Sequence, residues 1–452
     1  MEQNLSERHR FMTETPVRKL IVKLSIPATF SMLVTSVYGF ADAWFISQLG
    51  TAASGAVGIV FSVTSLLQAV GFTLGNGAGS LLSRFLGEKK RENANGVASL
   101  AFWLSLVVGL TLGILGLVFL SPVVHFLGAT ETIYPYAASY AVYLFCAAPM
   151  ICGSFVLNNL LRAEGKVTYS MVGFVVGNIL NIALDPLFIF TFGMGCAGAS
   201  LATLISQTVS LLILLSAYVF KQSGISLHPK HIKPHIRSLG NVLLTGLPSL
   251  FRQGLASLAS ILLTRTARQW GDAAVAAVSV VSRIFLLLYS FCLGIGQGMM
   301  PAAGFNKGDG QQKRVTELYR FALILATAIM FLLAVPTAIF APQIIGFFRP
   351  DQHVIAIGKN ILRAHCAVLT LHGIIAVTNM FLQAIGNRFG AALLAAARQG
   401  IFFLPLIFWL PNAFGLGGLE WTQALADLLT FGLTLPFLIL YFKKAKSEPR
   451  DT

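Results

Sequence analysis

The stretch 50-GTAASGAVG-58 recurs later in the chain as 271-GDAAVAAVS-279, and this repeat decides how the rest of the chain is organised. We call the displacement from position 50 to position 271 the repeat offset. Three further pairs of segments keep it: Ile26-Pro27 with Leu247-Pro248, Gly75-Asn76-Gly77 with Gly296-Gln297-Gly298, and the segment 161–165 with the segment 382–386. Because all four pairs of segments keep the same offset, the two halves are predicted to be repeats of one structural unit.

Each half is rich in long apolar segments. Of the 452 residues, 56% are hydrophobic and only 11% are charged, which excludes an ordinary water-soluble protein. Apolar runs near or above the roughly 20 residues that cross a bilayer occur twelve times. We place them at 20–46, 53–85, 95–120, 133–158, 167–192, 195–220, 241–265, 273–305, 318–340, 357–385, 389–411 and 415–442. Each is expected to be helical, because a backbone in lipid must satisfy its own hydrogen bonds.

The repeat and the spans together predict the architecture. Six spans in each half give both halves the same orientation in the membrane. We therefore expect an all-α integral membrane protein with twelve transmembrane helices in two pseudo-symmetric six-helix bundles. The N-terminal lobe covers residues 1–220, a cytoplasmic basic linker covers 221–240, and the C-terminal lobe covers 241–452. Two like bundles on either side of a cleft suit transport by alternating access.

Charge in the loops predicts the orientation. The tails and the turns on their side of the membrane carry 23 Lys and Arg residues, whereas the opposite loops carry three, Arg265, Arg268 and Arg349. The positive-inside rule then places both termini in the cytoplasm, with the protein in the plasma (inner) membrane. The net charge of +15 is mostly a consequence of this topology, so we expect no nucleic-acid partner.

Several kinds of chemistry are not expected. The five Cys residues lie in apolar runs without a C-x-x-C pair, so neither disulfides nor a thiolate metal site is predicted. No phosphate-binding G-x-x-x-x-G-K-[ST] motif occurs, so we expect no ATPase domain, and energy from an ion gradient or from the substrate's own gradient. No nucleophile–base pair is recognisable, so the chain is not predicted to be an enzyme or to hold a cofactor.

Acidic residues inside the spans do not follow the repeat. Asp42 and Asp185 lie deep in the first half, and their equivalents in the second half are apolar. A carboxylate in hydrocarbon costs several kcal/mol unless it is paired or hydrated, so an unrepeated pair is a functional candidate.

Polar side chains recur at helical spacing around these two acids. The stripes are Tyr38 and Asp42, then Asn178, Asn181 and Asp185, and then Ser200, Thr203 and Gln207. At about 1.5 Å per residue, Asp42, Asp185 and Thr203 lie at similar depths, roughly 6, 10 and 12 Å from the outer edge. This set suits a monovalent cation such as Na⁺, or protons, and no other metal is predicted. A purely structural hydrogen-bond network is the alternative.

Two prolines lie beside these stripes. Pro186 removes the amide that would bond the Ile182 carbonyl, and Pro27 does the same for Lys23. We expect both positions to act as hinges.

The second half carries the opposite charge. Arg252, Arg283, Arg363 and Arg398 fall in its spans, with Asp427 the only deep acid. Arg252-Gln253-Gly254 and Arg398-Gln399-Gly400 repeat one tripeptide near mid-depth, where Asp427 could pair with either arginine. A buried ion pair that braces the lobe and a role in substrate contact or gating both remain open, and we count Asn178, Gln207, Arg252, Gln253, Arg398, Gln399 and Asp427 as candidates for the latter.

These segments resemble the multidrug and toxic compound extrusion (MATE) family over essentially the whole chain. The residues that carry the resemblance are Tyr38 to Asp42, Leu157-Asn-Asn-Leu-Leu-Arg-Ala-Glu-Gly165, Asn178 to Pro186 and Gly195-Cys-Ala-Gly198-Ala. Gly246-Leu-Pro-Ser-Leu-Phe-Arg252-Gln253, Gly296 to Gly298 with Pro301, Gly304 to Asn306, and Arg398-Gln399 are similar to its MepA-like branch.

The resemblance implies H⁺- or Na⁺-coupled antiport that exports bulky amphipathic, often cationic, drug-like compounds. It also implies that the coupling ion binds at Asp42, Asn181, Asp185 and Thr203, with Tyr38 nearby. Some branches carry an acid in helix 7 or 8, where this chain has Arg252 and Arg283, so a second cation site there is not expected. The arginines leave open an anionic or zwitterionic substrate, and an alternative function is a flippase or exporter of an anionic lipid-linked glycan.

Overall fold

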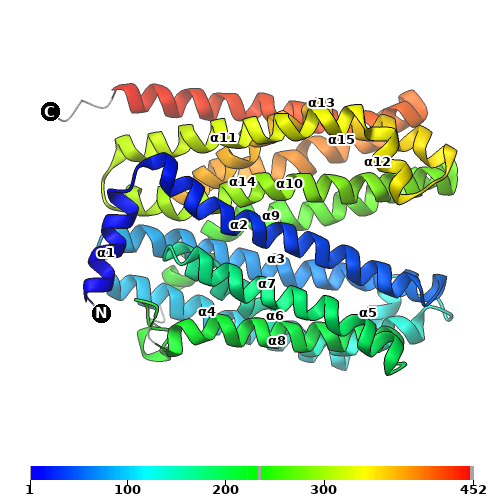
Figure 1. Cartoon of the computed structure of the whole chain (residues 1–452), viewed down its shortest axis with the longest axis horizontal. Helices are drawn as coiled ribbons and strands as arrows, with labels where there is room; N and C mark the ends of the chain where they lie inside the picture. Colours follow the sequence, from blue (N-terminus) through cyan, green and yellow to red (C-terminus); the bar gives the residue numbers. More distant parts are fainter. Residues whose placement is uncertain (1, 221, 233–235, 448–452) are drawn as a thin grey trace. The chain divides into compact units, whose positions relative to one another are not determined.

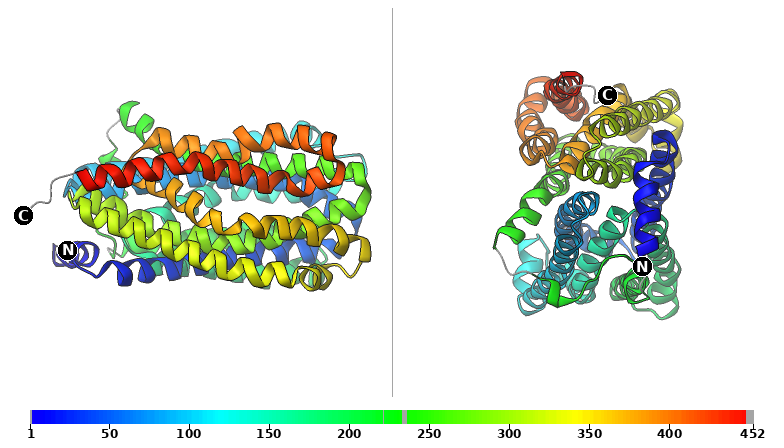
Figure 2. Two further views of the ribbon diagram at one scale, coloured as in Figure 1. Left: turned by 90° about the horizontal axis from the view of Figure 1, so that it is seen from above. Right: turned by 90° about the vertical axis from the view of Figure 1, so that its left-hand side faces the viewer.

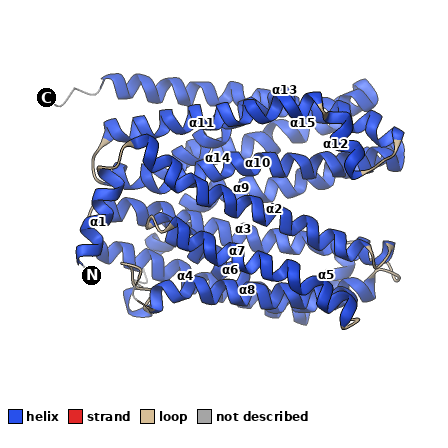
Figure 3. Cartoon of the chain, viewed as in Figure 1, coloured by secondary structure: helices blue, strands red, loops and turns tan. Residues whose placement is uncertain are grey.

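The computed structural model describes residues 2–220, 222–232 and 236–447, and within these ranges the chain is helical without strands (Figure 3). The helices are α1 (Glu2–Thr13), α2 (Val17–Ser47), α3 (Thr51–Gly87), α4 (Arg91–Val118), α5 (Leu120–Phe126), α6 (Tyr134–Ala163), α7 (Val167–Pro186), η1 (Leu187–Thr191), α8 (Gly195–Val219), η2 (Pro229–His231), α9 (Ile236–Ala267), η3 (Arg268–Trp270), α10 (Gly271–Gly308), α11 (Gln312–Ile339), α12 (Ala341–Phe348), α13 (Gln352–Ile385), α14 (Arg388–Ala396), η4 (Ala397–Phe402) and α15 (Phe403–Ser447).

The described residues contain ten continuous apolar segments long enough to cross a membrane. Two of them are far too long for one crossing, with 71 residues at Ser238–Gly308 and 58 at Arg388–Ala445. A helix as long as the first would measure about 107 Å against a hydrocarbon core of about 30 Å. The first is divided at Gly271, where φ is 82°, and the second at Gly415, where φ is 60° and ψ is −139°. Each therefore supplies two spans, and the predicted twelve transmembrane helices are confirmed.

The contacts between helices divide the chain into two units. Unit 1 comprises residues 1–12 and 30–250, and unit 2 comprises residues 13–29 and 251–452. The boundaries therefore differ from the predicted lobes, because α2 and α9 are each shared between the units. The two division points are separated by the repeat offset, and each lies shortly after a proline, Pro27 or Pro248.

One helix forms the centre of each unit. In unit 1, α6 packs against α3, α4, α7 and α8, and these helices lie side by side along much of their length (Figures 1 and 2). In unit 2, α13 packs against α10, α11, α14 and α15. The most apolar windows of α6 and α13 are 72% and 78% buried, against 22–50% for the other spans. The remaining helices thus keep one apolar face outward, as expected in lipid.

Local geometry repeats at the same offset. Asn158 donates to the Ser170 carbonyl at 3.0 Å, and Asn379 donates to the Ala391 carbonyl at 2.6 Å. Gly50 and Gly271 both have a positive φ at the start of a long helix. The first residues of the short helices α5 and α12, which the sequence pattern did not predict, are also related by the repeat offset.

One residue departs from the repeat at a strained turn. Lys89 has a φ of 60°, the one positive φ among the described non-glycine residues, and its equivalent is Gly310 with a φ of 81°. A side chain in the left-handed region costs roughly 1–2 kcal/mol. Lys89→Gly should therefore stabilise the protein by about 0.5–1 kcal/mol, after the entropy cost of glycine is subtracted.

The measurement is the unfolding midpoint of the purified protein in detergent. Lys90→Gly provides the control, because Lys90 has a φ of −86° and has no such strain to release. A midpoint that falls in Lys89→Gly would contradict the expectation.

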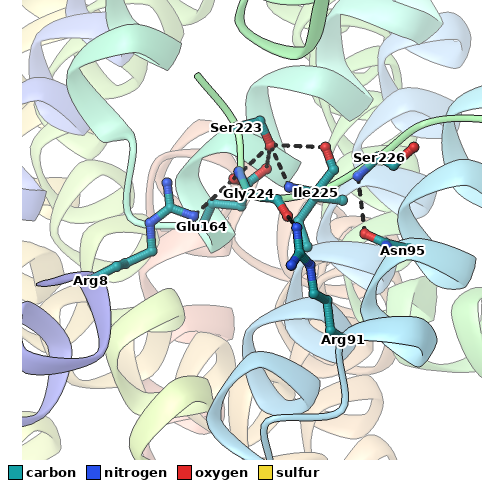
Figure 4. A network of polar contacts seen from close by, with 8 residues as sticks. All are labelled: Arg8, Arg91, Asn95, Glu164, Ser223, Gly224, Ile225 and Ser226. Carbon is teal, nitrogen blue, oxygen red and sulfur yellow. Dashed lines mark hydrogen bonds and ion pairs between the residues drawn. The ribbon is translucent and has the colours of Figure 1, made fainter. Parts of the chain in front are cut away.

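The first part of the predicted linker is packed against unit 1 (Figure 4). Ser223 donates to the buried Glu164 carboxylate at 2.7 Å, and the Gly224 amide lies 3.3 Å from the same carboxylate. Arg8 of α1 forms an ion pair with Glu164 at 3.0 Å. Burial and the nearby Arg8 guanidinium lower the pKa of Lys166, which Glu164 partly offsets. One carboxylate at the end of α6 thus holds α1 and the chain after α8.

Further contacts extend this attachment to α4. Arg91 donates to the Gly224 carbonyl at 3.1 Å, and Asn95 accepts from the Ser226 amide at 3.0 Å (Figure 4). Ile225 is buried, and α9 begins at Ile236, within the segment 221–240 predicted as linker. Residues 221 and 233–235 lie outside the described ranges.

Candidate functional site

The two predicted carboxylates lie together in unit 1. Asp42 extends from α2 and Asp185 from the end of α7, with relative exposures of 8% and 0%. They are close enough to interact electrostatically. In the described part of the chain, Oδ1 of each has no hydrogen-bond partner. Unsatisfied carboxylate oxygens are costly in a buried site, so this pair requires a proton, a cation or water.

Asn181 and Thr203 connect this pair to α8. With its amide nitrogen toward Asp185, Asn181 donates to Asp185 Oδ2 at 3.1 Å. Its oxygen then accepts from the Thr203 hydroxyl at 3.3 Å and from the Thr203 amide at 3.1 Å. Asn181 and Asp185 lie one turn apart on α7, as the helical spacing predicted. The contact with α8 fixes the orientation of the Asn181 and Asp185 side chains. Asp185 Oδ1 remains without a hydrogen-bond partner in the described part of the chain.

Two tyrosines complete the site. Tyr38 lies one turn before Asp42 on α2 and interacts with both carboxylates and with Thr203. Tyr140 of α6, which the sequence pattern did not single out, is 5% exposed and interacts with Asp42. A single aromatic residue in an apolar helix creates no periodic pattern that would indicate a site. The one available sign was the depth of Tyr140, close to the outer end of its span.

Other predicted polar residues of the first half lie beside the site or face elsewhere. Asn178 donates to the Thr35 hydroxyl of α2 at 3.0 Å, so it joins α7 to α2 away from the carboxylates. Gln207 is half-buried, and its backbone carbonyl accepts from Ser154 at 3.3 Å. The hydrogen bonds described for these two residues do not involve Asp42 or Asp185, and their roles in substrate binding remain predictions.

The predicted hinge residues occupy distinctive backbone positions. Pro186 is the last residue of α7, and the π-helical turn η1 follows, in which the Phe192 amide bonds the Leu187 carbonyl at 2.9 Å. Such turns widen a helix and frequently occur at functional sites. Pro27 lies inside α2, shortly before the division of that helix between the units.

The basic residues of unit 2 form a separate cluster. Arg398 pairs with Asp427, with Nε 2.8 Å from Oδ1, whereas Arg252 donates to Asn379 Oδ1 at 3.1 Å. The structure thus selects one of the two pairings that the sequence left open. Gln399 is 8% exposed and its Oε1 has no partner in the described ranges, while Gln253 is half-buried.

The acid pair can bind a small cation or exchange protons. Among the described residues, no group of three or more His, Cys, Asp or Glu side chains is arranged to hold a metal ion. The acid pair supplies carboxylate oxygens, and the phenol oxygens of Tyr38 and Tyr140 lie nearby. Oxygens of these kinds bind protons and hard monovalent ions.

Comparison with known proteins identifies the family. The sequence profile described as MatE matches residues 27–187 and 248–417, once in each half, and the two matches start at positions related by the repeat offset. The chain belongs to the MatE family. Like other MATE proteins it is a multi-pass membrane transporter, and this family includes multidrug exporters.

Individual relatives cover nearly the whole MATE chain. It is 27% identical over 428 residues to the multidrug export protein MepA of Staphylococcus aureus, with 94% of each chain covered. The Staphylococcus haemolyticus protein of the same name is 26% identical over 419 residues, with 92% of each covered. A solved outward-facing multidrug-resistance MATE transporter is 27% identical, with a TM-score of 0.91 and 97% and 98% coverage of this chain and that one. A MATE crystal structure in a bent conformation has a TM-score of 0.87 at 27% identity and covers 97% and 99%.

Proposed function

We propose that this MATE protein is a cation-coupled antiporter that exports bulky amphipathic, often cationic, compounds. The carrying observation is the buried pair Asp42 and Asp185, each with an open carboxylate oxygen in the described part of the chain. Two carboxylates close together in a low-dielectric site bind positive charge strongly and exchange it with the medium. The names of the relatives support multidrug export as the transport class.

The coupling ion is H⁺ or Na⁺. Asp42, Asp185, Asn181 and Thr203 form its site, with Tyr38 beside them. The orientation of Asn181 toward Asp185 and Thr203 uses its amide oxygen, so two carboxylate oxygens remain open. Two oxygens suffice for a shared proton, whereas Na⁺ requires additional oxygens from water or from a rearranged site. The residues therefore support proton coupling somewhat more directly than sodium coupling.

Transport follows alternating access. When the site is open to the outside, it takes up the ion, α2 bends near Pro27 and the drug is released. The ion then leaves on the inside and the drug is captured again from the cytosol or the inner leaflet. Coupling requires that ion and drug bind the two conformations with different affinities. The division of α2 shortly after Pro27 supports a hinge at that proline.

The protein works in the plasma membrane, the inner membrane of a bacterium with two membranes, with both termini in the cytoplasm. This placement is supported by the excess of Lys and Arg in the tails and in the turns on their side. Its partners are the bilayer and small drug-like molecules.

A flippase of an anionic lipid-linked glycan is the rival function. The arginines in the spans of the second half favour it, and the relatives named for multidrug export weigh against it. Growth rescue of a strain depleted of such a flippase separates the two, because a drug exporter fails in that assay.

Reconstituted protein tests the proposal directly. Ethidium efflux from proteoliposomes is expected to accelerate under an imposed pH gradient or an imposed sodium gradient, applied separately. The gradient that drives efflux identifies the ion, and protein-free liposomes give the leak rate. Efflux that neither gradient accelerates would contradict cation-coupled export.

A further inference from the structure

A second buried polar centre, distinct from the acid pair, lies in unit 2. Asp427 of α15 is fully buried and accepts from Arg398 Nε at 2.8 Å and from Gln423 Nε2 at 3.0 Å. His372 Nε2 of α13 lies 3.2 Å from its other oxygen. Asp427 thus holds Arg398 through the guanidinium Nε.

Another nitrogen of that guanidinium is not satisfied. Arg398 Nη2 is buried and has no hydrogen-bond partner among the described residues. A buried donor on a charged group without an acceptor costs more than a neutral one. A carboxylate oxygen is the acceptor that a charged N–H donor of this kind bonds most strongly.

Aromatic rings flank the same group. The Arg398 guanidinium carbon lies 5.2 Å from the ring centroids of Phe285 and Tyr289, both on α10. Arg398 belongs to the π-helical turn η4, whose extra residue per turn moves side chains out of regular register. The rings limit hydration of the cation, which strengthens its attraction for an anion.

The charge balance close to Arg398 agrees with an anionic ligand. Tyr289 interacts with two arginines, Arg398 and Arg252, but with one acid, Asp427. A brace between helices needs only the pair Arg398 and Asp427. The excess of positive charge around Tyr289 favours an anion over a cation as the ligand of unit 2.

We propose that Arg398 binds the carboxylate of those exported aromatic compounds that carry one, so that unit 2 adds affinity for anionic and zwitterionic molecules. Phe285 and Tyr289 stack on the aromatic body of the ligand, while Asp427, Gln423 and His372 are positioning residues. This inference rests on the export function proposed above, and it adds a carboxylate site to the cation site of unit 1.

The test compares two dyes that differ in one group. A rhodamine with a free carboxylate and the methyl ester of the same rhodamine are titrated onto the purified full-length protein, and fluorescence anisotropy gives each Kd. Arg398→Gln alone leaves the Asp427 carboxylate buried without a counter-charge and can fail to fold. The neutral double variant Arg398→Gln/Asp427→Asn avoids this problem. Arg363→Gln is the control, because Arg363 is an exposed arginine that bonds the Ala338 carbonyl.

In the wild type, the free acid should bind more tightly than the ester. In the double variant, affinity for the acid should fall by about tenfold or more, while affinity for the ester changes less than about twofold. The control should change neither. Equal affinity of the wild type for both dyes, or an equal loss of both in a double variant that melts like wild type, would overturn the proposal. Ethidium efflux in parallel separates this failure from failure of the export function.

Discussion

Asp185→Asn should strongly reduce ethidium efflux driven by an ion gradient. The amide has the size of the carboxylate and can still hydrogen-bond Asn181, but it carries no charge and cannot be protonated at physiological pH. The coupling between ion and drug is then lost, and gradient-driven efflux should fall by about tenfold to hundredfold. Rates in proteoliposomes of equal protein content, with the pH gradient and the sodium gradient imposed separately, give the result.

Asp42→Asn should give a loss of the same order, because the Asp42 and Asp185 carboxylates are close enough to interact electrostatically. Glu420→Gln is the matched control. It also converts a buried acid to its amide, but Glu420 accepts from Asn360 at 3.3 Å in unit 2 and has no part in the acid pair. Wild-type rates in either aspartate variant would show that the acid pair is a structural network and does not couple.

A conformational readout makes the prediction more specific. If Asp185 binds the coupling ion, the ion should change the wild-type spectrum, for example tryptophan fluorescence, and this change should vanish in Asp185→Asn. A variant that keeps the spectral response but loses efflux would place the defect in drug binding.

The sequence predicted the fold because its signal is repeated along the chain. Apolar runs of bilayer length define the spans, and the repeat offset defines the halves without any knowledge of contacts. Helical spacing also placed Asn181 and Asp185 on one face, and the structure joins them with a hydrogen bond. Apolar runs, helical spacing and the repeat can all be recognised from the order of the residues, without knowing which helices are in contact.

What the sequence did not predict depends on how neighbouring helices are rotated. Tyr140 reaches Asp42 because α6 presents that face to the site, and no spacing within α6 indicates it. The choice of Arg398 over Arg252 as partner of Asp427 is of the same kind. The π-helical turn at Arg398 alters the register there, so an ideal helix would misplace this side chain.

Glycines explain why α2 and α9 are divided between the units. In unit 1, a Cβ on Gly246 of α9 would lie 2.0 Å from the Thr73 carbonyl oxygen, and one on Gly77 of α3 would lie 2.2 Å from the Val242 carbonyl oxygen. In unit 2, a Cβ on Gly298 of α10 would lie 2.7 Å from the Ser25 backbone. The first part of α9 therefore packs with its backbone directly against the backbone of α3, and the first part of α2 packs in the same way against α10. Ser25 and Gly246, like Gly77 and Gly298, are equivalent positions in the repeat, so the two halves share this packing.

Gly246→Ala should therefore be strongly destabilising, although alanine is the better helix former. The added methyl group meets backbone atoms of α3, which cannot rotate away, and such overpacking costs about 1–3 kcal/mol or more. Gly254→Ala, on the same helix α9, is the matched control, because a Cβ there meets nothing within 4 Å. It should stabilise the protein by about 0.5–1 kcal/mol through helix propensity alone. Unfolding midpoints in detergent should move in opposite directions for the two variants. If both rose, the close contact between α9 and α3 would not exist in the folded protein.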